Sequence, residues 1–167
     1  MFTTLDTFLQ TWSYESASTQ KLMDALTDAS LSQPVHEGGR TLGRLAWHVA
    51  QTLPEMMGKT GLHVAGLGEH DPAPASASAI AQAYREASAS LMEQLQAHWT
   101  DATLLEQDDM YGDQWTRGVT LSILVNHQSH HRGQMTVLMR QAGLPVAGMY
   151  GPSKDEWAQM GMDPPPV

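Results

Sequence analysis

Apolar side chains recur every three or four residues in four long stretches of the chain, a spacing typical of helices that bury one face. The first stretch predicts a helix from about residue 4 to residue 28. Its apolar positions are Leu5, Phe8, Leu9, Trp12, Leu22, Met23 and Leu26. The next segment contains Pro34, Gly38 and Gly39, residues that disfavour a helix interior, so we expect the helix to be followed by a break.

Three further helices follow from the same pattern. The second is predicted to start after Thr41, which can cap its first turn, and to end near Gly58. Pro54 is expected to kink or shorten it. The third is predicted over residues 76–99. The fourth is predicted over residues 119–142, because a glycine and a proline directly after this range stop the helix.

The connections carry no pattern of alternating apolar and polar residues, as half-buried strands would. Residues 60–75 are predicted to form a long loop, and residues 100–118 no regular structure. A short last helix is expected over residues 153–160. The predicted fold is therefore all-α: a four-helix bundle with long connections and a short C-terminal helix, forming a single domain over residues 1–167.

Composition narrows the range of partners. Hydrophobic residues make up 41% of the 167 residues, and nine basic against eighteen acidic residues give a net charge of −9. Such a charge repels nucleic acids and anionic membrane surfaces. No apolar stretch approaches the roughly 18 residues of a membrane span, and the N-terminus lacks the basic start of a secretory signal. We therefore expect a cytoplasmic protein that binds neither nucleic acid nor membrane.

The chain has no cysteine and eight histidines. A metal ion would therefore have to be held by histidine, aspartate or glutamate side chains. Disulfides and thiolate nucleophiles of the chain itself are excluded.

The most informative histidines lie in the segment NHQSHHRGQM, residues 126–135, inside the fourth predicted helix. His127 and His131 are four residues apart, within the apolar face, so their Cβ atoms lie about 5 to 6 Å apart and both rings can reach one ion. His130 falls on the flank of that face, and Arg132 on the opposite side, where we expect a helix-surface or subunit contact. His48, in LAWHVAQ of the second helix, completes a candidate group of three metal ligands.

Each of these candidate site residues also has a simpler structural interpretation. A single buried histidine is more often a hydrogen-bonded core residue than a ligand. Glu55, two turns beyond His48, is a candidate fourth ligand, ligand-orienting group or catalytic general base, but a solvated carboxylate is the simpler reading. Asn126 and Gln134 are candidates for hydrogen bonds near the site, although amides are common on helix surfaces.

The run NHQSHHRGQMTVLMRQAGLPV, the upstream LAWHVAQ and the downstream YGPSKDEW resemble the DinB/YfiT-like family of small bacterial metalloproteins. The resemblance covers nearly the whole chain. It implies a four-helix bundle, a homodimer, and a divalent metal, zinc or nickel, held by His48, His127 and His131. Related thiol-dependent isomerases and transferases have glutamate at the position of His127, and this chain departs from them there.

Three neutral ligands leave a position open on the ion, which suits catalysis on a small-molecule substrate. An activated thiol would give a thiol S-transferase or a thiol-dependent isomerase, with a low-molecular-weight thiol as co-substrate. A metal-bound hydroxide would instead give a hydrolase. A third alternative is a non-catalytic metal-binding protein of the stress response. The residues alone leave these alternatives open, and the family resemblance favours the thiol chemistry.

Overall fold

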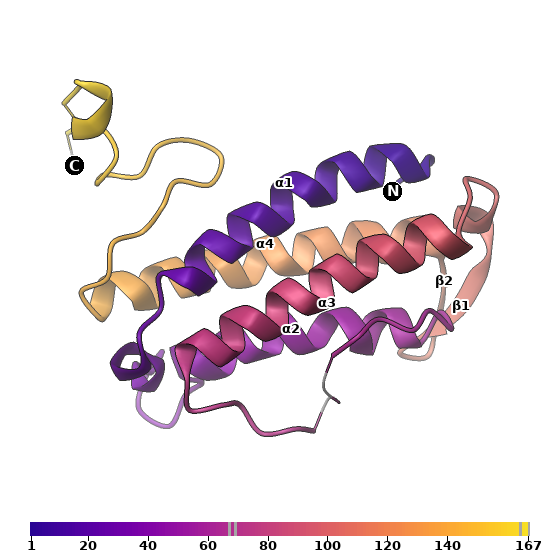
Figure 1. The fold of residues 1–167 in the computed structure, drawn as a ribbon, viewed down its shortest axis with the longest axis horizontal. Helices are drawn as coiled ribbons and strands as arrows, with labels where there is room; N and C mark the ends of the chain where they lie inside the picture. Colours follow the sequence, from indigo (N-terminus) through magenta and orange to yellow (C-terminus); the bar gives the residue numbers. More distant parts are fainter. Residues whose placement is uncertain (67, 69, 164, 167) are drawn as a thin grey trace.

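The structure is a computed structural model that describes residues 1–66, 68, 70–163 and 165–166. Four long helices lie side by side along most of the molecule (Figure 1). They are α1 (Leu5–Asp24), α2 (Leu42–Gly58), α3 (Ala77–His98) and α4 (Arg117–Gln141). Helices α1 and α2 each pack against both α3 and α4. The fold is thus mostly helical, with every long helix contacting two others.

Each long helix starts at a hydroxyl side chain that accepts a hydrogen bond from a backbone N–H three residues further on. These residues are Thr4, Thr41, Ser76 and Thr116. Such caps satisfy amide groups that have no partner within the helix. They place the start of α4 two residues earlier than periodicity predicts, because the cap lies before the apolar pattern begins.

The helices enclose one apolar core, to which all four contribute large side chains. Phe8 and Trp12 of α1 are fully buried and stack with ring centroids 5.8 Å apart. Trp47 of α2 and Tyr84 of α3 are buried in the same core. None of the described helices combines the length and the apolar character needed to cross a membrane.

Two predicted helix boundaries are wrong. The first helix ends at Asp24, before a short 3-10 turn over Asp28–Ser32 that Thr27 caps at its start. Pro54 does not shorten α2, which ends at Gly58 as predicted. The expected helix at 153–160 is reduced to a 3-10 turn over Ala158–Met160. Apolar periodicity locates helix ends poorly, because capping side chains such as Thr27 lie outside the apolar pattern.

The all-α prediction is also wrong, because the connection at 100–118 contains a hairpin. Strands β1 (Gln107–Met110) and β2 (Asp113–Thr116) pair antiparallel. The two turn residues, Tyr111 and Gly112, both have positive φ, at 62° and 92°. This is the turn geometry that matches the twist of paired strands. Four-residue strands are too short to show a periodicity, which is why the sequence pattern misses them.

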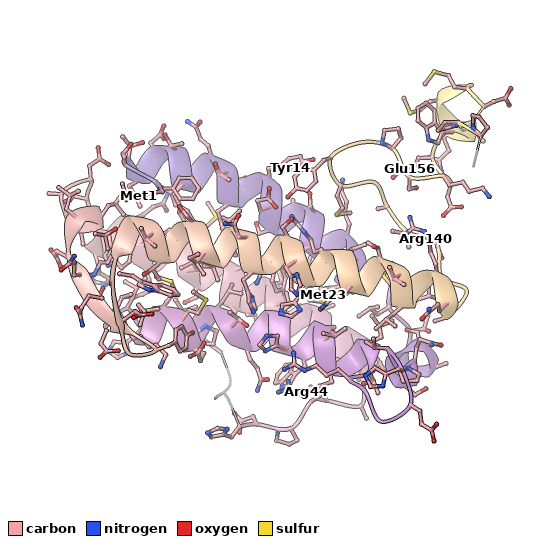
Figure 2. The ribbon with its side chains drawn as sticks, turned by 180° about the vertical axis from the view of Figure 1, so that it is seen from behind. Met1, Tyr14, Met23, Arg44, Arg140 and Glu156 are labelled. Carbon is pink, nitrogen blue, oxygen red and sulfur yellow. The ribbon has the colours of Figure 1, made fainter. Side chains whose placement is uncertain are left out.

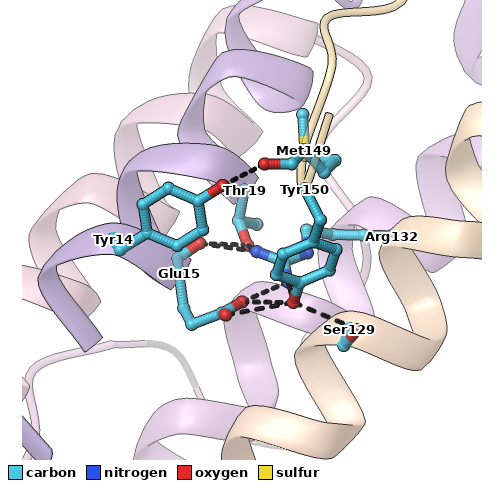
Figure 3. A network of polar contacts seen from close by, with 7 residues as sticks. All are labelled: Tyr14, Glu15, Thr19, Ser129, Arg132, Met149 and Tyr150. Atoms are coloured by element: carbon cyan, nitrogen blue, oxygen red, sulfur yellow. Dashed lines mark hydrogen bonds and ion pairs between the residues drawn. The ribbon is translucent and has the colours of Figure 1, made fainter. Parts of the chain in front are cut away.

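Arg132 corrects a further expectation, because it is buried and not at the helix surface. Its side chain is 2% exposed and forms an ion pair with Glu15 of α1, which is itself buried (Figure 3). One guanidinium nitrogen donates to the Glu15 backbone carbonyl at 2.8 Å, and another to the Tyr150 hydroxyl at 2.7 Å. Helix α4 contacts α1 as well as α2, so it buries a second face that the apolar pattern does not mark.

Replacing Arg132 with alanine is expected to lower the free energy of unfolding by about 3 to 5 kcal/mol, because Glu15 would remain buried without its partner. The matched control is Arg140→Ala, an exposed position on the same helix, with an expected change within about 0.5 kcal/mol. Urea unfolding of both variants measures the difference. Equal losses in the two variants would contradict the assignment of Arg132 to a buried ion pair.

Candidate metal centre

Three histidine side chains converge where α2 packs against α4. His48 comes from α2, and His127 and His131 lie one turn apart on α4. The Nε2 atom of His127 lies 3.1 Å from Nε2 of His48 and 3.1 Å from Nε2 of His131. Ligand atoms of all three residues lie within 4.8 Å of one another. Nitrogen ligands of a tetrahedral zinc ion are about 3.3 Å apart, so this spacing suits a single ion.

Hydrogen bonds between the three rings cannot satisfy all of their nitrogen atoms. The Nε2 atom of His127 faces two other ring nitrogens, yet a ring nitrogen of a neutral imidazole either donates one hydrogen bond or accepts one. Its Nδ1 atom is buried and has no hydrogen-bond partner in the described part of the chain. A divalent cation accepts lone pairs from all three Nε2 atoms together. The donor set therefore fits a metal ion better than a group of hydrogen-bonded rings.

An amide side chain orients one of the rings. The Oε1 atom of Gln134 lies 2.7 Å from Nδ1 of His131. As an acceptor, it places the proton on Nδ1 and leaves the Nε2 lone pair facing the other two rings. The Gln134 amide nitrogen contacts His130, which is exposed. Asn126 is also exposed, and no hydrogen bond within the described residues links it to the three rings.

A buried amide fixes how α4 lies on α2 at this point. Gln128 is fully buried, and its Nε2 donates a hydrogen bond of 3.1 Å to the backbone carbonyl of Val49. Gln128 directly follows His127, and Val49 directly follows His48. The bond therefore holds the two histidines opposite each other. Sequence periodicity misses Gln128 because a polar residue does not contribute to an apolar face.

Burial makes the rings poor bases. Burial is the main cause, and together with the charges of neighbouring histidines and Arg40 it lowers the pKa of His48 and that of His127 from 6.5 to about 4. Burial also lowers the pKa of His131, against the effect of its Gln134 hydrogen bond. All three rings are therefore neutral near pH 7, which is the protonation state that metal binding needs.

A cavity of about 440 Å³ opens beside the three rings, and His48 and His127 form part of its wall. Its volume is that of a site for a small molecule. Glu55 lines the same cavity, where it accepts hydrogen bonds from the Tyr111 hydroxyl at 2.8 and 3.0 Å and lies 3.7 Å from the Lys59 ammonium. The convergent ligand group found among the described residues contains no carboxylate, so Glu55 lies near the histidines without joining them.

The sequence pattern does not single out four other residues of the cavity wall: Arg40, Arg44, His70 and Tyr111. Arg44 could have been found, because it lies four residues before His48 and so on the same face of α2. The other three lie in the segment before α2, in a loop and at the hairpin turn. No periodicity indicates where such residues lie in space.

The fold and the three converging imidazoles define a small helical protein with a candidate metal site. The chain belongs to the DinB family, whose family model matches residues 1–164. This confirms the family resemblance of the histidine motifs.

Individual relatives agree with the family. YrdA of Bacillus subtilis (strain 168) is 47% identical over 165 residues, which cover 99% of both chains. The crystal structure of a DinB-like protein from Bacillus cereus ATCC 10987 is 49% identical and matches with a TM-score of 0.87, over 90% of this chain and all of that one. A second DinB-like structure, YjoA of Bacillus subtilis, covers 84% of this chain and 96% of its own, with a TM-score of 0.65. At 20% identity, it shows a shared fold alone.

The metal-free protein is expected to lose stability as the pH falls from about 6.5 towards about 4. In the unfolded chain His48 and His127 take up protons near pH 6.5, whereas in the folded chain they do so only near pH 4. Between these values the unfolded state binds more protons, so acid favours it. Urea unfolding of chelator-treated protein at several pH values measures the loss, and the variant His48→Gln/His127→Gln should show a smaller one. An unchanged pH profile in that variant would contradict the lowered pKa values.

Proposed function

We propose that this chain is a divalent-metal-dependent enzyme whose ion is held by His48, His127 and His131. One observation carries the proposal: Nε2 of His127 lies 3.1 Å from Nε2 of each of the other two histidines, beside a cavity large enough for a small molecule. Zinc or nickel suits a site made of imidazole nitrogens. Gln134 is proposed to orient His131, and the four long helices are proposed to form a four-helix bundle around the site.

The proposed chemistry is thiol transfer or thiol-dependent isomerisation on a small-molecule substrate. A bound divalent ion would supply a Lewis acid that stabilises a thiolate near neutral pH. The chain itself supplies three neutral donors, so no ligand charge offsets the charge of the ion. It has no cysteine, so the thiol must come from a low-molecular-weight co-substrate. The family resemblance supports this class of reaction, although His127 replaces the glutamate of the related thiol enzymes.

Hydrolysis is the second candidate reaction, and the position of Glu55 in the cavity wall favours it. A carboxylate on the wall of the same cavity can accept a proton from a water molecule as a general base. The Tyr111 hydroxyl and the Lys59 ammonium hold this carboxylate in place. A non-catalytic, stress-related metal-binding role is the third alternative. The homodimer, the single domain over 1–167 and the cytoplasmic location remain predictions.

Replacing His48, His127 or His131 singly with alanine is expected to weaken metal binding by at least about tenfold, because each replacement removes one of three ligands. The matched control is His130→Ala, which removes an exposed imidazole from the same stretch of α4. Metal content of protein prepared without a histidine tag, followed by titration with a competing chelator, measures the effect. The ligand set would be wrong if the His130 variant lost as much metal as the others.

A low-molecular-weight thiol is expected to change the visible spectrum of the cobalt-substituted protein, because sulfur ligation adds charge-transfer bands that zinc cannot show. Thiol addition to an epoxide, an alkyl halide or an unsaturated acid should then be measurable and should disappear in His131→Ala. Hydrolysis would show the opposite pattern: ester or amide cleavage without thiol, and inhibition by thiol. That pattern, with no spectral change, would refute the thiol chemistry.

A further inference from the structure

The cavity beside the three histidines has charges of opposite sign at different parts of its wall. Arg40 and Arg44 contribute two guanidinium groups, and Glu55 contributes a carboxylate. The carboxylate is already engaged, because the Tyr111 hydroxyl donates to both of its oxygens and Lys59 lies 3.7 Å away. No such neutralising partner serves the arginines: within the described residues, no carboxylate lies within 4.0 Å of either guanidinium.

Arg44 is held in position although its charge is not paired. Its guanidinium donates a hydrogen bond of 3.0 Å to Oε1 of Gln51, one of the buried side chains of α2. The Gln51 amide nitrogen in turn donates to the backbone carbonyls of Gly68 at 2.8 Å and Asp71 at 3.0 Å. A buried amide anchored on a loop therefore fixes a cation at the cavity. A guanidinium positioned in this way loses little freedom when it binds a ligand.

The field of Arg40 reaches the histidines as well. Its positive charge contributes to lowering the pKa of all three rings, and that of Arg44 contributes at His48. The chain as a whole carries a net charge of −9, so this cationic region contrasts with the rest of the protein. Anionic small molecules are attracted to such a region and repelled elsewhere.

We propose that Arg40 and Arg44 form a binding subsite for an anionic oxygen group, a carboxylate or a phosphate, on the small molecule used at the three-histidine centre. This inference rests on the proposed function and adds the class of substrate or co-substrate to it. Guanidinium groups bind the paired oxygens of carboxylates and phosphates through two parallel hydrogen bonds. The anionic group lies at the arginines, which leaves another part of the same molecule to face the histidines.

Calorimetric titration with succinate and, separately, with inorganic phosphate tests the subsite. Each titration uses the zinc-loaded and the chelator-treated protein in a buffer free of other oxyanions. The double variant Arg40→Gln/Arg44→Gln is expected to weaken binding of at least one anion by about tenfold or more. Arg140→Gln, which removes the same charge from an exposed arginine outside the cavity wall, should leave binding unchanged. The anion that depends on the arginines identifies the group.

Two further measurements separate this inference from the proposed function. The double variant should keep the zinc content and the melting temperature of the unsubstituted protein, because neither arginine is a metal ligand or a buried residue. If the protein binds no metal, the proposed function fails, while titration of the chelator-treated protein still tests the arginines. The subsite is refuted if neither anion binds, if the double variant binds both as tightly as the unsubstituted protein, or if Arg140→Gln weakens binding equally.

Discussion

The hydrogen bond from Gln128 to the backbone of Val49 is the contact on which the candidate site depends. It joins α4 to α2 at the residues that directly follow His127 and His48, inside a region that excludes water. A shift of α4 by one residue would rotate its histidines by about 100° around the helix axis, away from α2. The convergence of the three rings is therefore a property of the interface between two helices, and no single helix contains it.

Helix α4 contacts two different helices, α2 and α1, through different polar side chains. His127 and His131 face α2, while Arg132, the next residue along, reaches α1 and pairs with Glu15. Tyr150 from the C-terminal segment joins the same ion pair, with its hydroxyl within 3.0 Å of both carboxylate oxygens of Glu15 (Figure 3). Buried polar groups thus fix α4 on both sides. Figure 2 shows Arg44 on α2 and Arg140 near the C-terminal end of α4, far from each other.

The elements that leave a periodic pattern of residues in the sequence could be predicted from it. Helix periodicity locates all four long helices, and the four-residue spacing of His127 and His131 gives two of the three rings a common face. The hairpin could not be predicted, because strands of four residues contain too few alternations to show a pattern. Arg132 was misplaced because periodicity identifies a single apolar face, whereas α4 buries a polar one as well. Arg40 and Tyr111 line the cavity only through tertiary folding, which no local pattern encodes.

Tyr111 at the tip of the hairpin shows a conflict between stability and cavity chemistry. Its φ of 62° lies in the left-handed region, which a bulky side chain occupies at a cost of about 1 to 2 kcal/mol. Glycine or asparagine would adopt this turn with less strain, but neither has a hydroxyl able to reach Glu55 from there. Selection for a more stable hairpin and selection for a hydroxyl at the cavity wall therefore act in opposite directions at this one position.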